Sequence, residues 1–273
     1  MDASAPKPPD KNVVNALAKG FRVLEAFTAD ATELTLAETA RRAGIDNATA
    51  FRLLNTLVML GYVEKIDGTR RFRLTLKCLG LGFNAIARSD LRALARPVLR
   101  ALVGEVNEAA SIGVLDGADV VYVERIQAGL TRLGVDVRIG SRVPVYATAI
   151  GQAILSGLPR ETQRQVLAAR RLDPLTPNTL TTEGALLDRL DLVRARGYAL
   201  SDQETVLGLR VLAAPVVDVD GVPVAGLSVA APGSRMTIAA FEEAARAPVL
   251  AAASALSRAM QASGGFAAQT ATG

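Results

Sequence analysis

Three residue types that build many functional sites are scarce or missing in this chain. Its 273 residues contain no histidine, no tryptophan and a single cysteine, Cys78. One cysteine cannot form an internal disulfide or a thiolate-rich metal cage, and the commonest zinc ligand and general base is absent. The composition therefore argues against most hydrolases and metalloenzymes, and we expect no cofactor. Cys78 lies among aliphatic residues and is expected to pack there as a small apolar side chain.

Long hydrophobic segments are missing as well. No stretch reaches the roughly eighteen consecutive apolar residues of a membrane-spanning helix, and the polar, proline-bearing N-terminus lacks the apolar core of a signal peptide. We therefore expect a cytoplasmic protein that does not contact a membrane. A length of 273 residues, with 50% of them hydrophobic, is sufficient for two domains that each have a core.

The small excess of positive charge is unevenly distributed. The net charge is +4, and residues 1–88 contain 13 Lys and Arg against 9 Asp and Glu, whereas the remainder contains 18 of each sign. The whole excess therefore lies in the N-terminal third of the chain. Such a distribution is typical of a domain that binds the phosphates of a nucleic acid.

Residues 33–60 have the pattern of a helix, a tight turn and a second helix. Thr35 and Glu38 have the spacing of a capping box, which predicts that a helix begins at Leu36. Gly44 suits the left-handed conformation at a helix C-terminus, and Asp46 can cap the next helix. The short connection predicts a helix-turn-helix, which is a common DNA-binding motif.

The second of these helices has one apolar side and one polar side. Phe51, Leu54 and Val58, flanked by Ala50 and Leu57, are expected to face the core. The opposite side presents short polar groups, a methyl group and one arginine, which suit base edges and phosphates in a major groove. Its members are Ala48, Thr49, Arg52, Asn55 and Thr56. An ordinary helical hairpin with a solvated face would show the same pattern, so this stretch alone leaves both alternatives open.

The next segment favours DNA binding. Residues 62–65 and 71–74 have strand character and flank Asp67-Gly68, a hairpin turn signal. This pattern predicts a wing that carries Arg70, Arg71 and Arg73 beside the recognition helix, where they can contact phosphate. We take as candidate DNA contacts Thr35, Asn47, Ala48, Thr49, Arg52, Asn55, Arg70 and Arg71.

The order of patterns along the chain predicts its domain organisation. Residues 1–11 are expected to be a disordered arm, and a first helix with Leu17, Phe21, Leu24 and Phe27 at helical spacing is expected to pack beneath the other two. The predicted segments are a winged helix-turn-helix domain at 12–75, a linker helix at 76–89, a second domain at 90–262 and a disordered tail at 263–273.

The second domain is predicted to be α+β. After a helix at 90–106, strands are expected at 110–115, 120–126 and 133–138, as an antiparallel meander. Helices follow at 148–155, after Pro159 and from Thr182 to Gly197. A hairpin with strands 211–219 and 222–231 turns at Asp220-Gly221, and a helix from about 237 to 260 closes the domain. An antiparallel sheet flanked by helices results.

Taken together, the chain resembles the IclR-type transcriptional regulators over essentially residues 14–260. Distinctive matches include Leu-Thr-Leu-Ala-Glu, Thr-Ala-Phe-Arg-Leu-Leu and Ile-Gly-Ser-Arg-Val-Pro-Val-Tyr-Ala-Thr. The matching stretches are 17–25, 34–38, 49–54, 60–63, 139–155 and 207–216. Within the family, Asp202-Gln203-Glu204 and Tyr146-Ala147-Thr148 look most like the branch that governs aromatic-acid catabolism, such as the degradation of 4-hydroxybenzoate and protocatechuate.

The resemblance implies a winged helix-turn-helix, a linker helix and a GAF-like effector-binding domain. It also implies homodimers, often paired into homotetramers, that bind double-stranded DNA at near-palindromic operators and respond to a small organic acid. Motif by motif, the family's effector positions fall on Gly134, Ala149, Ile150, Ser201, Asp202, Leu209, Val211, Ser228 and Ala230. We add Tyr146, which stands where many members have histidine and can meet an aromatic ring or phenol.

Physical arguments support part of this set. Ala149 and Ile150 are expected in the first turn of a helix, where free N–H groups favour a carboxylate. Ser228 and Ala230 alternate on one strand and can line one cavity. Val211 and Ala230 replace the cysteine and serine that occur in other members, which makes a small polar acid less suitable than a larger, flat one. Aliphatic members of the set are also consistent with plain core packing.

Three arginines are further candidates for binding a carboxylate. They are Arg132, Arg138 and Arg142, which lie in or near a predicted strand. An alternating strand would more often point such side chains to solvent or to a dimer interface. We therefore leave these arginines out of the effector set.

Two other functions remain in competition. An enzyme could use Asp202 and Glu204 for acid/base chemistry, but no nucleophile or oxyanion site is evident beside them. A pure interaction module could use the helix-turn-helix as a protein contact, but the basic wing argues against this. We therefore expect a DNA-binding regulator that is not an enzyme.

Overall fold

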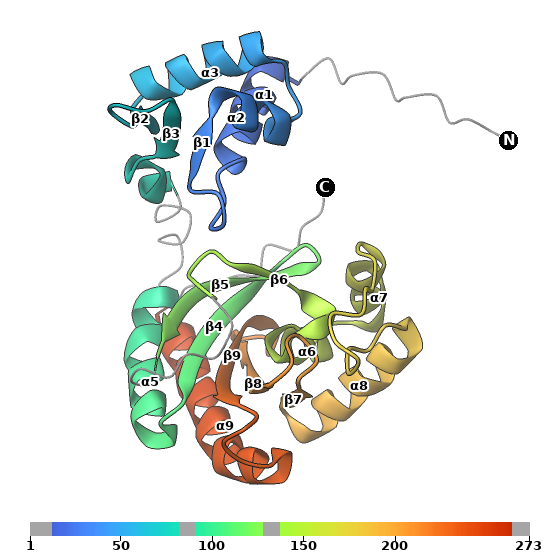
Figure 1. The fold of residues 1–273 in the computed structure, drawn as a ribbon. Coiled ribbons are helices and arrows are strands. Elements are labelled where there is room, and N and C mark those ends of the chain that lie inside the picture. Colours follow the sequence, from blue (N-terminus) through green and yellow to red (C-terminus); the bar gives the residue numbers. More distant parts are fainter. Residues whose placement is uncertain (1–12, 82–90, 128–136, 264–273) are drawn as a thin grey trace, which may run out of the picture. The chain divides into compact units, whose positions relative to one another are not determined.

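The chain folds as two compact units, residues 1–85 and 86–273. The computed structural model describes residues 13–81, 91–127 and 137–263, and Figure 1 shows the elements of both units. The predicted arm at 1–11 and nearly all of the predicted tail at 263–273 lie outside the described residues. Residues 77–81 of the predicted linker helix are helical, and its part from 82 to 89 also lies outside. None of the described helices is long and apolar enough to cross a membrane.

The smaller unit combines helices with a short antiparallel sheet. The strand order in that sheet is β1-β3-β2. Its elements are α1 (Asn15–Glu25), β1 (Glu33–Thr35), α2 (Leu36–Ala43), α3 (Asn47–Met59), β2 (Val63–Lys65) and β3 (Arg71–Leu74). The predicted hairpin of β2 and β3 is confirmed, with Gly68 of its turn at a φ of 72°. Strand β1 was not predicted, because Thr35 both ends this strand and caps the following helix.

Local hydrogen bonds define the helix-turn-helix as predicted. The Thr35 hydroxyl accepts the backbone N–H of Glu38, whose carboxylate accepts the backbone N–H of Thr35 at 2.8 Å. Gly44 ends α2 with a φ of 63°, in the left-handed region. Asp46 then accepts the backbone N–H of Thr49 at 2.8 Å and caps α3. These contacts confirm the two helices and the turn between them.

The buried side of α3 differs from the prediction. Ala50, Leu54 and Leu57 are buried, whereas Phe51 and Val58 are 53% and 38% exposed. Apolar residues occupy more than one stripe of this helix, so spacing alone could not determine which stripe meets the core. The stripe through Leu54 is the one that packs into the core of the smaller unit, which includes Val23 and Phe27. The prediction for α1 was partly wrong for the same reason, since Leu17 and Phe21 are exposed and Val23 is buried.

The larger unit is built on an antiparallel sheet. Among the described residues this sheet has six strands in the order β6-β5-β4-β9-β8-β7. Its elements are α5 (Leu91–Val106), β4 (Ala109–Asp116), β5 (Asp119–Ile126), β6 (Arg142–Pro144), the short 3₁₀ helix η1 (Val145–Ala147), α6 (Ala149–Ser156), α7 (Arg160–Ala168), α8 (Glu183–Arg196), β7 (Ala199–Asp202), β8 (Leu209–Val217), β9 (Pro223–Pro232) and α9 (Ile238–Ala262). The α+β class is confirmed.

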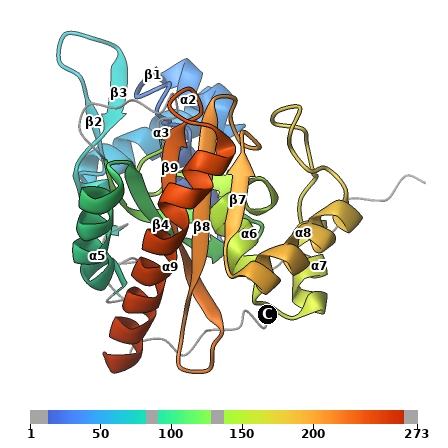
Figure 2. The ribbon, with the colours of Figure 1, turned by 90° about the horizontal axis from the view of Figure 1, so that it is seen from below.

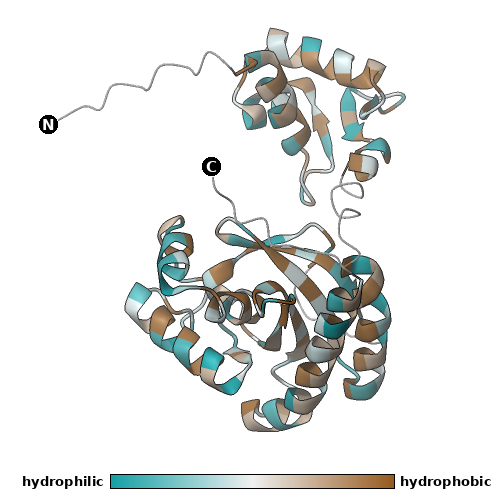
Figure 3. Ribbon diagram, turned by 180° about the vertical axis from the view of Figure 1, so that it is seen from behind, coloured by the Kyte–Doolittle hydropathy of each residue, from teal (hydrophilic) through white to brown (hydrophobic). Residues whose placement is uncertain are grey.

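Helices cover both faces of this sheet. On one face, α5 and α9 bury a core that includes Ile112, Leu212 and Leu227, and Figure 2 shows α9 lying across the long strands. On the other face, α6 and α8 bury a second core around Ile150 and Leu190. The alternation of hydrophobic and hydrophilic residues in the outer helices, visible in Figure 3, follows from this arrangement, since α5, α8 and α9 each have one side in water.

Most predicted elements of the larger unit are confirmed. Strands β8 and β9 pair around Asp220-Gly221, and α6, α7, α8 and α9 lie where helices were predicted. The predicted strand at 133–138 is not confirmed. Val137 and Arg138 lie outside any strand, and residues 133–136 lie outside the described part of the chain. The strand beside β5 is instead β6. Strand β7 was missed because its four residues follow a helix directly.

Two glycines allow α6 to approach the sheet. Gly113 on β4 and Gly226 on β9 face each other across the strand pair. A Cβ atom at Gly226 would lie 2.8 Å from Ile150 Cγ2 and 3.0 Å from the Ile150 carbonyl oxygen. Helix α6 therefore packs on backbone at this point. Two residues farther along the strands, on the same face, Ser111 and Ser228 form the next pair.

This close contact leads to a stability prediction. We expect Gly226→Ala to destabilise the protein by about 1–3 kcal/mol, because α6 must move to admit the methyl group. The midpoint of urea unfolding, followed by circular dichroism on the full chain, measures the effect. Gly104→Ala in α5 is the matched control: a methyl group there would meet no neighbouring atom within 4 Å, so the mutation should raise stability by roughly 0.5–1 kcal/mol. Equal stability of Gly226→Ala and wild type would contradict the packing argument.

Candidate functional site

The exposed side of α3 presents most of the predicted DNA contacts. Asn47, Ala48, Arg52 and Asn55 are exposed, and no ion pair or side-chain hydrogen bond holds the Arg52 guanidinium among the described residues. The side chain of Arg52 is therefore available to a base edge or a phosphate. Phe51 lies on this exposed part of the helix as well, which makes the surface less polar than predicted.

Two of the predicted DNA contacts already have structural roles. The Thr35 hydroxyl donates to the Glu38 carboxylate at 2.9 Å while it accepts the Glu38 N–H. The Thr49 hydroxyl donates to Asp46 at 2.7 Å. The backbone N–H groups of Thr35 and Thr49, and after them these hydroxyls, hold the pKa of the Glu38 and Asp46 carboxyl groups below their usual values, since hydrogen bonds to the charged form favour it. Each hydroxyl retains accepting capacity but has committed its proton.

The three arginines of the wing differ in whether a protein group already binds their guanidinium. Arg71 donates to the Glu33 carbonyl at 3.1 Å and lies 3.6 Å from Glu38, and Arg73 pairs with Glu64 at 2.5 Å. Arg70 is exposed and has no such partner within the described residues. Of these three cations, Arg70 is the one that can meet a phosphate without first leaving a protein partner.

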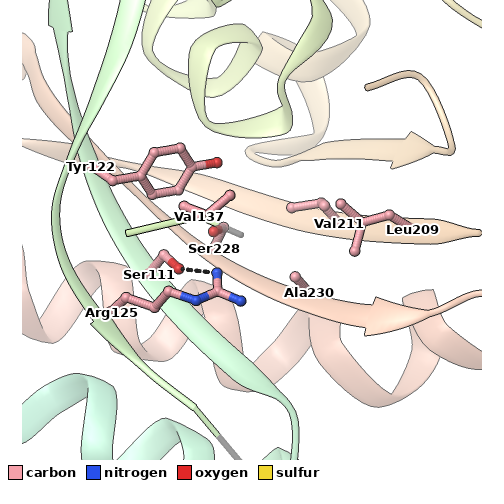
Figure 4. A pocket seen from close by; sticks show the side chains of 8 residues that line it. All are labelled: Ser111, Tyr122, Arg125, Val137, Leu209, Val211, Ser228 and Ala230. Carbon is pink, nitrogen blue, oxygen red and sulfur yellow. Dashed lines mark hydrogen bonds between the residues drawn. The ribbon is translucent and has the colours of Figure 1, made fainter. Parts of the chain in front are cut away.

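A cavity opens on the α6 side of the larger sheet, beside the Ser111–Ser228 pair. Its open space is about 310 Å³, counting solvent at its mouth. Figure 4 shows the residues that line it. They are Ser111, Tyr122, Arg125, Val137, Leu209, Val211, Ser228 and Ala230. Four predicted effector positions meet here: Leu209, Val211, Ser228 and Ala230.

Arg125 is the only charged residue among the described residues that line this cavity. Its Nη1 donates to the Ser111 hydroxyl at 3.0 Å, while its buried Nε has no hydrogen-bond partner in the described part of the chain. Burial lowers the pKa of Arg125, although an arginine remains protonated in a protein. A half-buried cation without a carboxylate partner is costly, and an anionic ligand would relieve that cost.

A β-bulge brings Arg125 and Tyr122 to the same face of the sheet. Ser111 pairs with Arg125 and Gly113 pairs with Tyr122, so Val123 is the extra residue on β5. Strict alternation would have placed positions 122 and 125 on opposite faces. Glu124, on the other face, pairs with Arg92 of α5 at 2.9 Å. The bulge therefore directs one charged residue into the cavity and its neighbour towards a helix.

The other predicted effector residues that the structure describes do not line the cavity. Tyr146 is buried and donates its hydroxyl proton to the Asp173 carbonyl at 2.7 Å. Ala149 and Ile150 are buried in the first turn of α6, whose Gly151 N–H is capped by Thr148. Gly134 lies outside the described residues.

Ser201 and Asp202 lie on the neighbouring strand β7. Ser201 pairs with Val211, which places it one strand beyond the cavity wall, and it is buried. The Asp202 carboxylate instead accepts a hydrogen bond from Arg210 at 2.8 Å. Because Arg210 precedes Val211 on β8, this ion pair lies on the opposite face of the strand from the cavity residue.

Sequence reasoning did not find Ser111, Tyr122, Arg125 or Val137. A lone arginine in an alternating strand is expected to face solvent, and the bulge that changes its direction has no signal in β5, which contains neither glycine nor proline. Of the three arginines weighed as carboxylate partners, Arg142 pairs with Asp116 and Asp119, and Arg132 lies outside the described residues.

The two carboxylates considered for catalysis are both bound by other side chains of the protein. Glu204 is buried and accepts hydrogen bonds from Arg189 at 2.7 Å and from Gln152 at 2.9 Å. Asp202 is held by Arg210 on β8. The two acids therefore have separate partners and do not face a common space as an acid/base pair would.

Comparison with known proteins identifies the family. The IclR helix-turn-helix domain matches residues 16–67, and the bacterial transcriptional regulator IclR C-terminal domain matches residues 83–258. The chain belongs to the IclR family. IclR-family proteins are transcriptional regulators with a DNA-binding domain and an effector domain, not enzymes.

Individual IclR-family proteins match along most of the chain. The transcriptional regulator KdgR of Escherichia coli is 34% identical over 89% of this chain and 90% of its own. The p-hydroxybenzoate hydroxylase transcriptional activator of Acinetobacter baylyi is 35% identical over 80% of this chain and 81% of its own. A solved IclR homologue from Microbacterium hydrocarbonoxydans in complex with 4-hydroxybenzoate is 26% identical, with a TM-score of 0.79 over 90% of this chain and 99% of that one.

Arg52 and Arg70 of the DNA-binding unit should have different roles. We expect Arg52→Ala to weaken binding to the specific operator by about 1–3 kcal/mol and binding to random DNA much less, because Arg52 lies on the exposed side of α3 that we predict to meet base edges. Arg70→Ala should weaken binding to both DNAs alike and reduce the salt slope by roughly one, since a phosphate contact carries no sequence information. Fluorescence anisotropy at several salt concentrations measures both. An equal loss on both DNAs for Arg52→Ala would exclude base reading.

Proposed function

We propose that this IclR-family regulator binds a near-palindromic operator as a homodimer or a pair of dimers, and that a small aromatic acid in the cavity of the larger unit changes this binding. The single observation that carries the effector proposal is the Arg125 guanidinium, which projects into the cavity and has no acidic partner among the described residues. A carboxylate is the group that best satisfies a planar guanidinium.

The DNA-binding part of the proposal rests on the smaller unit. Helix α3 offers Asn47, Ala48, Arg52 and Asn55 to a major groove, and Arg70 at the wing is available for phosphate. One such unit contacts only one half-site, because a recognition helix spans a few base pairs. Two units in a symmetric dimer would read two half-sites, which supports a near-palindromic operator.

The aromatic part of the proposal rests on the walls of the cavity. Val137, Leu209, Val211 and Ala230 are apolar, and Tyr122 adds an aromatic ring. A flat, apolar ligand body fits such walls, while a sugar acid would leave several hydroxyl groups without partners. Two of the similar proteins also support an aromatic acid. One is an activator for p-hydroxybenzoate hydroxylase, and the structure of another was solved with 4-hydroxybenzoate.

The proposed mechanism is a shift between two arrangements of the dimer. The acid stabilises the arrangement in which Arg125 can bind its carboxylate, and the two recognition helices have a different spacing in each arrangement. The acid then changes operator affinity only to the extent that it prefers one arrangement, and operator DNA must change the affinity for the acid by the same factor.

Selection of genomic fragments tests the whole proposal. Purified full-length protein is mixed with fragments of the source genome at two salt concentrations, with and without 4-hydroxybenzoate, and the bound DNA is sequenced. We expect one near-palindrome to be enriched, with a recovery that the acid changes. Uniform, weak recovery without a motif would overturn the DNA-binding proposal, whereas an enriched motif that gluconate changes and 4-hydroxybenzoate does not would overturn the aromatic one.

Removal of the positive charge of Arg125 should greatly weaken the affinity for the acid. We expect Arg125→Gln to weaken 4-hydroxybenzoate binding by about 2 kcal/mol, roughly thirtyfold in Kd, because the carboxylate loses its charged partner. Isothermal titration calorimetry on the full chain measures this. The neutral analogue 4-hydroxybenzamide should bind wild type and variant with similar affinity.

Arg100→Gln serves as the matched control. Arg100 is an exposed arginine of α5, so its replacement removes the same charge from the larger unit without touching the cavity. Its affinity for the acid should equal that of wild type. If Arg125→Gln also retained wild-type affinity for the acid, Arg125 could not be the carboxylate partner.

A further inference from the structure

Tyr122 brings a second unsatisfied polar group to the cavity. Its side chain packs against the core around Ile150 and lines the cavity, and no hydrogen bond to its hydroxyl is present among the described residues. Tyr146 and Tyr198 of the same unit are satisfied, since they donate to the Asp173 carbonyl and to the Glu242 carboxylate. The Tyr122 hydroxyl faces the cavity without a partner among the described residues, so it is available to a ligand group.

The Tyr122 hydroxyl remains a neutral donor and acceptor at physiological pH. Burial raises the pKa of this phenol, and the positive charge of Arg125 opposes the rise only in part. A neutral phenol can donate a hydrogen bond to a ligand hydroxyl or accept one from it. It carries no positive charge that would attract a carboxylate. The group that suits it is therefore an uncharged hydrogen-bonding group.

Tyr122 and Arg125 reach the cavity at separate places. Their partners on β4, Gly113 and Ser111, are two residues apart, which corresponds to roughly 7 Å along the strand. Figure 4 shows the Tyr122 hydroxyl and the Arg125 guanidinium on two sides of Val137 and Ser228, both directed into the same opening. A ligand in this opening can therefore contact both groups at once.

We propose that Tyr122 binds a hydroxyl group at the end of the effector opposite to its carboxylate, so that the effector is a hydroxylated aromatic acid. The inference rests on the proposed function, because it assumes that Arg125 binds a carboxylate in this cavity. Tyr122 then determines specificity: it discriminates between aromatic acids that share the carboxylate and differ at the far end of the ring. The apolar residues between the two polar groups hold the ring.

A chemical comparison isolates this contact. Calorimetry on the full-length protein measures the Kd of 4-hydroxybenzoate and of 4-methylbenzoate, in which a methyl group of similar size replaces the hydroxyl. We expect wild type to prefer the hydroxylated acid about tenfold, the value of one hydrogen bond in a partly buried site. Tyr122→Phe should reduce this preference to less than about twofold. Tyr198→Phe, which loses a hydroxyl outside the cavity, should keep it.

The outcomes separate the inference from the function on which it rests. Failure of wild type to bind either acid would overturn the aromatic effector itself. Binding of both acids with no preference, or a preference that persists in Tyr122→Phe, would overturn the role of Tyr122 and leave the aromatic effector intact. A Tyr122→Phe protein that had failed to fold would lose 4-methylbenzoate as well, and its thermal unfolding curve would show it, in which case the preference of wild type between the two acids decides.

Discussion

The candidate effector site depends on a single irregularity, the β-bulge at Val123. Because of this extra residue, Tyr122 and Arg125 share the cavity face of β5, although three positions separate them along the strand. The same bulge leaves Glu124 on the opposite face, where it binds Arg92 of α5. Without it, either the arginine or the tyrosine would enter the opposite core. The half-buried guanidinium then faces a small, mostly apolar space, and this combination is the basis of the proposed acid site.

Small residues determine where this space lies. Gly113 and Gly226 let α6 rest directly on the sheet, and the sheet continues past that contact to Ser111 and Ser228, which leave room for a ligand. Larger side chains at the serine positions would fill the cavity, whereas larger ones at the glycine positions would displace α6. The candidate ligand site and the contact with α6 therefore lie on the same face of β4 and β9. The serine pair borders the cavity, and the glycine pair contacts α6.

The DNA-binding unit also divides its polar side chains between structure and binding. Thr35 and Thr49 commit their hydroxyl protons to the caps that begin α2 and α3. Arg71 is held by Glu33 of β1 and Glu38 of α2, and Arg73 is held by Glu64 within the wing. Within the described part of the chain, Arg52 and Arg70 keep free guanidinium groups, which leaves both available to a DNA partner.

The sequence alone determined the features that depend on near neighbours. The caps at Thr35 and Asp46, the turns at Gly44, Gly68 and Gly221, and most helices and hairpins followed from residues within a few positions of each other, since their hydrogen bonds close locally. The placement of Ser228 and Ala230 on one cavity face followed from alternation. Tertiary structure decided which stripe of α3 is buried, which strand lies beside β5, and that Arg125 points inward. These depend on what packs against each element, and a bulge changes the direction of every later side chain without leaving a mark in composition or spacing.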